Sequence, residues 1–289
     1  MFAEEYVDSV KVRAYSSDLT PRQWELLKPL IHNSHTGRPI ELPLKDIVDG
    51  IFYKLANGCK WRDLPHDFPD YRRVNEWFVK WRDDGTWDRV LDHLRRLART
   101  AAGHDAEPSE ACVDSQTVKA AATGGVRGYD GGKKTNGRKR HILVDTLGLL
   151  LAVTVTVGSV SDSAGAVELL RGRVYPTTHP RLRVVHADAA YDRDGLKDYL
   201  RGPECQVRLK LVIRSKPKGV KGFVPVKKRW VVERTFGWFG KYRGLARDYE
   251  TNPNSSEATL KAVMVHVILQ RKLHLNTPSS NRQPLRLTA

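Results

Sequence analysis

The chain has 289 residues, of which 40% are hydrophobic and 28% charged, and its formal net charge is +16. This length is sufficient for one large domain or two small ones, each with a hydrophobic core. Such an excess of Lys and Arg indicates a polyanionic partner, usually nucleic acid, and no basic amphipathic anchor favours a membrane surface instead.

The cysteines Cys59, Cys112 and Cys205 are isolated, odd in number and not in CxxC spacing. This pattern argues against a zinc finger and a disulfide framework, and it favours a reducing cytoplasm. The first ten residues are mixed and acidic, unlike a signal peptide, and no apolar run approaches the ~20 residues that cross a bilayer.

Residues 18–100 carry mainly helical patterns. We expect helices at 18–31, 44–58, 71–85 and 87–103. The first has Asp18 or Thr20 as its cap and Pro21 in its first turn, and the second places apolar residues on one stripe and ends at Gly58.

The third predicted helix has an apolar and a basic face. Its apolar residues are Val74, Trp77, Phe78 and Trp81, and its outer basic residues include Arg72, Arg73 and Lys80. Three helices with a short turn before a basic third helix are typical of a helix-turn-helix. We therefore expect an all-α DNA-binding domain over residues 1–103, with a plain helical bundle as the alternative.

After a linker near residue 104 the pattern changes to strands. They are expected at 110–121, 140–148, 149–158, 182–191 and 205–214, with helices at 161–174 and 192–202. This β-β-β-α-β-α-β order indicates an α/β fold with an RNase H-like mixed sheet, followed by a helix that carries Glu233. We expect this domain over 104–275, with a basic loop at 214–229 and C-terminal helices, and a disordered tail at 276–289.

Three carboxylates stand in settings that bring them together. Asp114 lies in the first predicted strand, Asp188 at the carboxyl end of the fourth, and Glu233 in the following helix. In an RNase H-like sheet those two strands are neighbours, so two metal ions for phosphoryl transfer are predicted there. The alternative is that Asp188 caps a turn and that Glu233 pairs with Arg229.

Other titratable residues have structural explanations. We expect Asp145 in a turn, Asp162 as a helix cap and Asp130 as a structural residue of a glycine-rich segment. His141 and His186 are more typical of satisfied structural groups than of ligands. The glycine-rich segment lacks a P-loop pattern, so ATP use is not supported.

Two basic stretches are expected to flank the acidic site. The first contains Lys133, Lys134, Arg138, Lys139 and Arg140, and the second contains Lys216, Lys218, Lys221, Lys227 and Lys228. Contacts from such residues to phosphates give salt-dependent affinity that is largely independent of sequence. The alternative is that both stretches are solvated loops.

Several long segments resemble the DDE transposases of bacterial insertion sequences, in the IS-five family, from about Leu19 to Tyr249. They are DLTPRQWELLKPL, NGCKWRDLPHDFP with DGTW after it, DSQTVKAA, RGYDGGKKTNGRKRHILVDTLGLLLAV and RWVVERTFGWFGKYRGLARDYE. The resemblance implies an RNase H-like catalytic domain behind a helical DNA-binding region.

The resemblance also implies the catalytic and metal-binding roles of Asp114, Asp188 and Glu233. A related group has a Tyr, Arg, Glu, Lys signature around the last acid. Here Arg229 matches that signature and is carried over as a supporting residue, whereas Lys241 is one residue late, an offset of roughly 100° on a helix.

The activity implied is Mg²⁺-dependent cleavage of transposon-end DNA by two ions, with Mn²⁺ as a substitute, followed by attack of the 3′-hydroxyl on target DNA. The expected partners are double-stranded terminal inverted repeats, target DNA and further copies of the chain, in a homodimer or higher synaptic complex. The expected location is the bacterial cytoplasm, in association with the nucleoid. The alternatives are an RNase H-like nuclease without strand transfer and a non-enzymatic helix-turn-helix repressor.

Overall fold

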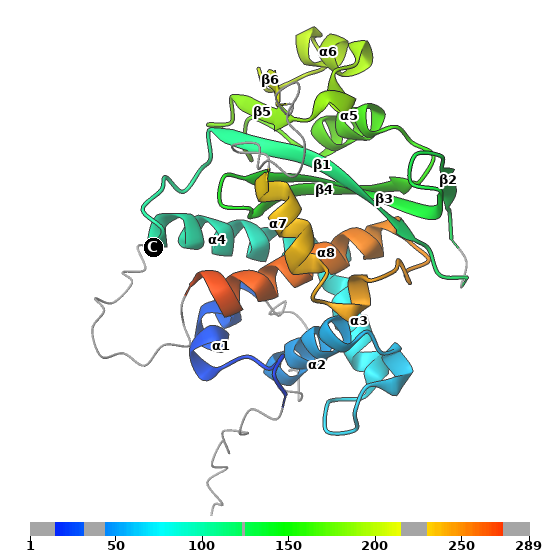
Figure 1. Cartoon of the computed structure of the whole chain (residues 1–289). Helices are drawn as coiled ribbons and strands as arrows, with labels where there is room; N and C mark the ends of the chain where they lie inside the picture. Colours follow the sequence, from blue (N-terminus) through cyan, green and yellow to red (C-terminus); the bar gives the residue numbers. More distant parts are fainter. Residues whose placement is uncertain (1–14, 32–43, 123–124, 215–229, 274–289) are drawn as a thin grey trace, which may run out of the picture.

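A mixed sheet lies between two layers of helices in the computed structural model, which describes residues 15–31, 44–122, 125–214 and 230–273 (Figure 1). The α-helices are α1 Pro21–Leu27, α2 Leu44–Asn57, α3 Tyr71–Asp83, α4 Thr86–Ala101, α5 Asp162–Arg173, α6 Asp194–Arg201, α7 Trp230–Phe239 and α8 Pro253–Val267. The strands are β1 Glu110–Lys119, β2 Gly128–Asp130, β3 Thr135–Asp145, β4 Leu150–Val157, β5 Val184–Ala187 and β6 Lys210–Ile213. Within these ranges, no helix is long and apolar enough to span a membrane.

The N-terminal helices begin and end where the sequence predicts. Thr20 and Gln23 form a reciprocal capping box at the start of α1, and α2 ends before Gly58, whose φ is +71°. The connection between α2 and α3 takes residues 58–70 and includes a 3₁₀ turn. It is longer than the ~3–4-residue turn of a helix-turn-helix, and the helix-turn-helix stays a prediction.

The sheet has the order β2-β3-β1-β5-β6, and β4 pairs with β3. β1 runs antiparallel to β3 and parallel to β5, so the first strand and the strand before Asp188 are neighbours, as predicted. The expected strand order misses β2, which has three residues and pairs with the start of β3. It also begins the next strand too late, because β3 starts at Thr135 within the basic segment.

The two faces of the sheet bury different residues. Ala111 and Val113 of β1 pack with α5 and α6, whereas Cys112 between them packs in the larger core with α4, α7 and α8. This alternation follows from the two-residue period of a strand. The helices α5 and α6 therefore cover one face, here called the α5 face, and α7 and α8 cover the other, the α7 face (Figure 1).

Helix α8 connects the N-terminal helices to the sheet. Residues 255–267 of α8 are all buried, and the helix contacts α2, α3, α4, α7 and β4. One hydrophobic core accordingly includes Ile51 of α2, Trp81 of α3 and Val153 of β4. The division of the chain at residue 103 stays a prediction, and the core of the described residues runs across it.

We predict that α5 tolerates no side chain at Gly165. A Cβ there would lie 2.0 Å from the ring of His141, which is fully buried and hydrogen-bonded to Thr156, so neither group can move at low cost. Gly165→Ala should lower the free energy of unfolding by about 1–3 kcal/mol in urea titrations. Gly172→Ala, in open space on the same helix, should be neutral or stabilising by up to about 1 kcal/mol; equal effects of the two variants would contradict this packing.

Candidate active site

The three predicted catalytic acids belong to one side of the sheet. Cys112 pairs with His186 in the parallel ladder of β1 and β5, and each lies two residues before one of the acids. Because side chains alternate along a strand, Asp114 and Asp188 are placed on the same face as Cys112. Helix α7, which carries Glu233 in its first turn, covers that face and contacts β1.

The carboxylates of Asp114 and Asp188 each accept a hydrogen bond from a nearby backbone N–H group. The Oδ1 atom of Asp114 accepts a hydrogen bond of 2.8 Å from the backbone N–H of Ser115. Asp188 caps the 3₁₀ turn Ala189–Tyr191 and accepts a 2.8 Å hydrogen bond from Ala190. The turn-capping role left open by the sequence is therefore present, and both aspartates are half-buried.

Helix α7 is tied to the β3–β4 turn by the two residues that follow Glu233. Arg234 donates to the carbonyl of Leu147 at 2.8 Å, and Thr235 donates to the carbonyl of Gly148 at the same distance. The guanidinium of Arg234 also lies between Trp230 and Trp238, 4.4 Å and 5.1 Å from their ring centroids. The spacing of four between these residues is the sequence signal for this stack, which was not predicted.

The donor chemistry of the three acids suits a divalent metal, because Mg²⁺ prefers carboxylate oxygens. Within the four described ranges, however, no three His, Cys, Asp or Glu side chains are gathered so that they could hold one ion. The acids share a face without forming an assembled ligand set. The two-metal site therefore stays a proposal.

The chain matches two families of known proteins. The family described as "Transposase DDE domain" matches residues 105–268, and "Putative transposase of IS4/5 family" matches residues 19–91. The first match covers more than half of the chain and includes all three acids.

This chain belongs to the DDE transposases of bacterial insertion sequences. Such an enzyme has a catalytic domain of RNase H-like fold, in agreement with the mixed sheet between helices.

Individual relatives of the transposase come from insertion elements. It is 32% identical over 108 residues to the "Insertion element IS402 uncharacterized 16.2 kDa protein" of Burkholderia cepacia, covering 35% of this chain and 72% of the relative. It is 33% identical over 132 residues to the "Putative transposase for insertion sequence element IS402" of the same organism, covering 43% of this chain and 59% of the relative. No solved structure matches the chain significantly.

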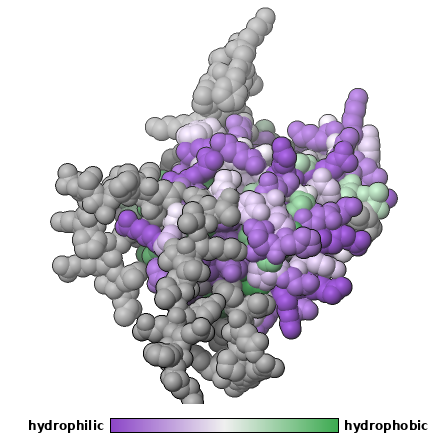
Figure 2. Space-filling model, turned by 90° about the horizontal axis from the view of Figure 1, so that it is seen from below, coloured by the Kyte–Doolittle hydropathy of each residue, from purple (hydrophilic) through white to green (hydrophobic). Residues whose placement is uncertain are grey.

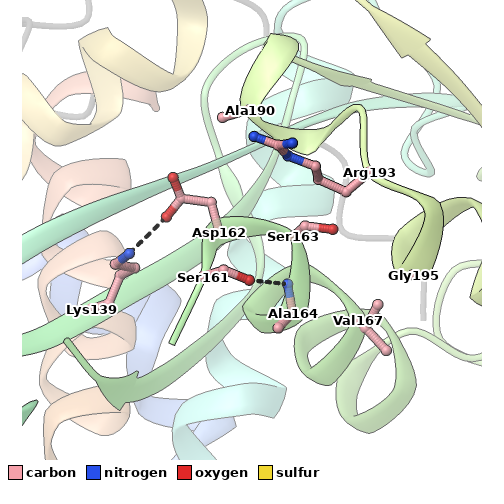
Figure 3. Close-up of a pocket in the computed structure, with 9 residues that line it drawn as sticks. All are labelled: Lys139, Ser161, Asp162, Ser163, Ala164, Val167, Ala190, Arg193 and Gly195. Carbon is pink, nitrogen blue, oxygen red and sulfur yellow. Dashed lines mark hydrogen bonds and ion pairs between the residues drawn. The ribbon is translucent and has the colours of Figure 1, made fainter. Parts of the chain in front are cut away.

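On the α5 face, a network of polar side chains lies behind the acids. Asp162 was expected to cap α5. The N-cap is instead Ser161, and Asp162 is the first residue of the helix. Asp162 instead accepts a 2.7 Å hydrogen bond from Ser115 and lies 3.0 Å from the ammonium of Lys139. Asp162 and Lys139 line a cavity of about 710 Å³, which Arg193 also lines (Figure 3).

Tyr191 is buried beneath this end of the sheet. Burial raises the pKa of its hydroxyl well above the usual value, and the charges of Asp114, Asp162 and Asp188 raise it further. The phenol therefore stays protonated at any physiological pH. The hydrogen bonds of Ser115 to Asp114 and Asp162 also place the network on the α5 face and this acid at the same end of the sheet.

Three predicted DNA contacts require correction, because the structure buries Arg138, Lys139 and Arg140 in β3. Arg138 donates to the carbonyls of Val126, Glu250 and Thr251, and Arg140 donates to the carbonyl of Leu245. Burial lowers the pKa of Arg140 to about 10, which leaves it charged. The basic residues hide the alternation of a buried strand, so the sequence predicts the start of this strand only at Arg140. The three side chains are no longer proposed to contact DNA.

The other predicted basic contacts are exposed where the structure describes them. Lys133 and Lys134 lie at the turn between β2 and β3, and Arg72, Arg73 and Lys80 lie on the outer face of α3. Of the residues that Figure 2 colours by hydropathy, most on the face seen from below are hydrophilic (Figure 2). Of the remaining predicted residues, Lys216, Lys218, Lys221, Lys227, Lys228 and Arg229 lie outside the described residues, and Lys241 is exposed in the turn after α7.

The two histidines of the sheet, His141 and His186, have structural roles. His186 contacts Glu110 at 2.7 Å, and His141 contacts Thr156 at 3.0 Å. Burial lowers the pKa of His141 from 6.5 to about 4, and burial does the same to His179. The imidazoles of His141 and His179 are therefore neutral near pH 7.

We predict that His141 and His179 contribute a fall in the free energy of unfolding as the pH drops from about 6.5 to about 4. In that range the unfolded chain binds a proton at each of these histidines and the folded chain does not, so each contributes a slope of up to about 1.4 kcal/mol per pH unit. Urea titrations across the range measure the fall. NMR titration of the His141 ring should give a midpoint near 4; a midpoint near 6.5 would contradict the assignment.

Proposed function

We propose that this transposase cleaves DNA at the ends of an insertion sequence and transfers the freed 3′-hydroxyl to target DNA. The observation that supports this most is the placement of Asp114, Asp188 and Glu233 on one side of the sheet in a DDE domain. Carboxylates carried on one face by two neighbouring strands and a helix would suit phosphoryl transfer once they hold metal ions.

We propose that these three acids hold two Mg²⁺ ions, for which Mn²⁺ substitutes. When bound, such ions supply an activated water or hydroxyl nucleophile and stabilise the leaving oxygen. Because the described carboxylates do not form a ligand set, we expect the set to be completed only with DNA present. The tie of α7 to the β3–β4 turn through Arg234 limits how far Glu233 can move.

Basic residues near the sheet and basic residues of the N-terminal helices would both bind the DNA. Lys133 and Lys134 at the β2–β3 turn would contact phosphates, as would the basic residues of segment 214–229. The outer face of α3, with Arg72, Arg73 and Lys80, would contact the terminal inverted repeat. A recognition helix in this region is proposed without the short preceding turn of a helix-turn-helix.

Two ends of an element must be processed together, so we propose a homodimer or larger synaptic complex. The high positive charge supports a double-stranded DNA partner, because two copies of the chain would repel each other unless a polyanion lay between them. The proposed location is the bacterial cytoplasm, in contact with the nucleoid.

We predict that each of Asp114→Asn, Asp188→Asn and Glu233→Gln abolishes cleavage of a labelled inverted-repeat end while leaving DNA binding intact. The amide keeps the size of each side chain but removes a charged oxygen donor. Cleavage and joining are read on a gel with a target plasmid and Mg²⁺, and binding is read by fluorescence anisotropy.

A matched control is Asp88→Asn, which changes an aspartate of α4 that pairs with Lys261 of α8 and is not one of the three acids. It should cleave like the unchanged protein. Undiminished cleavage by one of the three acid variants would remove that residue from the site. Cleavage without any joined product would favour a nuclease, and binding without either product would favour a repressor.

We predict that exposed basic residues of segment 133–140 contribute to DNA affinity, whereas buried ones contribute to stability. Lys133→Gln and Lys134→Asn should each reduce the slope of log affinity against log salt by about 1, because each removes one phosphate contact. Asn is chosen at Lys134 because its φ of 50° is one that Asn tolerates. Neither variant should change stability.

Arg138→Met is the counterpart. It leaves Asp248, 3.3 Å from the guanidinium, buried without its charge partner, and should lower the free energy of unfolding by about 3–5 kcal/mol. The folded fraction should keep the salt slope of the unchanged protein. A reduced slope with unchanged stability would return Arg138 to the DNA interface.

A further inference from the structure

Ser115 connects the two faces of β1. Its backbone N–H donates to Asp114 on the α7 face, and its hydroxyl donates to Asp162 on the α5 face. Both hydrogen bonds have normal lengths, 2.8 Å and 2.7 Å. The position of the Asp114 carboxylate therefore depends on a residue that is itself held from the opposite side of the sheet.

Lys139 holds Asp162 in place. Its ammonium is buried and lies 3.0 Å from Asp162 and 3.3 Å from Asp130, so that one cation joins two carboxylates. A buried lysine is costly unless it is paired. These pairs explain why a lysine occurs inside the sheet.

Asp130 anchors the far end of this network. It accepts from Thr117 at 2.5 Å and from the backbone N–H groups of Gly132 and Lys133. The hydrogen bond from Thr117 is the main reason that the pKa of Asp130 falls to about 2. The carboxylate is thus fixed by β1 and by the β2–β3 turn together, which leaves Lys139 little freedom to release Asp162.

Helix α5 is held just as firmly. Ser161 caps its first turn, and Gly165 lets it approach the ring of His141 on β3. Asp162 is the first residue of this helix, so its carboxylate is delivered to Ser115 by the packing of α5 on the sheet. Figure 3 shows Asp162 directed toward Lys139 from the start of α5.

We propose that Asp162 and Lys139 are positioning residues for Asp114, and that they act through Ser115. This inference rests on the proposed function, in which Asp114 binds the metal ions of the reaction. The pair lies on the α5 face, opposite to the acid, and is linked to the strand from which the acid projects through the hydroxyl of Ser115. Groups behind metal ligands that orient them typically change metal affinity or activity by ~10–100-fold when removed.

The experiment is a double-mutant cycle in two readouts. Asp162→Ala, Ser115→Ala and the double variant are compared for kcat and KM of end cleavage, and for Mn²⁺ affinity of the complex with end DNA by EPR titration. Each single variant should lower kcat by ~10–100-fold and weaken Mn²⁺ binding by ~10-fold, with KM for DNA changed less than ~2-fold. The double variant should be no worse than either single one, because both remove the same link.

Conservative and matched variants separate positioning from folding. Asp162→Asn keeps an acceptor for Ser115 and Lys139→Arg keeps the cation, so both should recover much of kcat, whereas Lys139→Met should not. Lys261→Met removes another buried lysine, paired with Asp88 on the far side of α8, and should lower stability without lowering kcat of the folded protein.

Two results would overturn the proposal. One is Mn²⁺ affinity that is the same in the unchanged protein and in Asp162→Ala, and the other is additive effects of Asp162→Ala and Ser115→Ala. If the unchanged protein fails to cleave DNA, the proposed function fails, and the Mn²⁺ cycle still decides whether Asp162 positions Asp114.

Discussion

The rest of the structure depends on a helix that is buried on every side. Among residues 255–267 of α8 several are polar, and burial of such groups is costly unless each is paired. Glu257 accepts from the backbone of Val155 and from Arg173, and Lys261 pairs with Asp88. These pairs fix α8 against β4 on one side and α4 on the other, so the N-terminal helices and the sheet cannot be packed independently.

This arrangement explains how basic residues became part of the core. The segment before α8 passes beside β3, and its carbonyl groups at Glu250 and Thr251 accept from Arg138 across more than 100 residues of sequence. Arginine can satisfy several acceptors at once with its planar group of donors. A net charge of +16 therefore overstates the charge available to DNA, since some of the cations hold the chain together.

Local signals in the sequence were enough to predict most elements. Pro21 with Thr20 marked the start of α1, and the apolar runs before Asp114 and Asp188 marked two neighbouring strands. Strand β2 was not predicted because a strand of three residues is too short to show an alternation of apolar and polar side chains. The start of β3 was not predicted because arginines such as Arg138 are usually found at the surface. Their burial is decided by acceptors that are distant in sequence, which no local pattern contains.

The candidate site shows the same division between local and distant information. The shared face of Asp114 and Asp188 follows from strand periodicity, so the sequence could predict it. The role of Asp162 could not be predicted, because its carboxylate meets Ser115 only after α5 has packed on the sheet. The sheet thereby separates two sets of carboxylates: Asp114 and Asp188 on the α7 face, and Asp130 and Asp162 on the α5 face, where both contact the ammonium of Lys139. Without that lysine, Asp130 and Asp162 would lie on the α5 face without the cation that both contact, and burial of such charges is costly when they are unpaired.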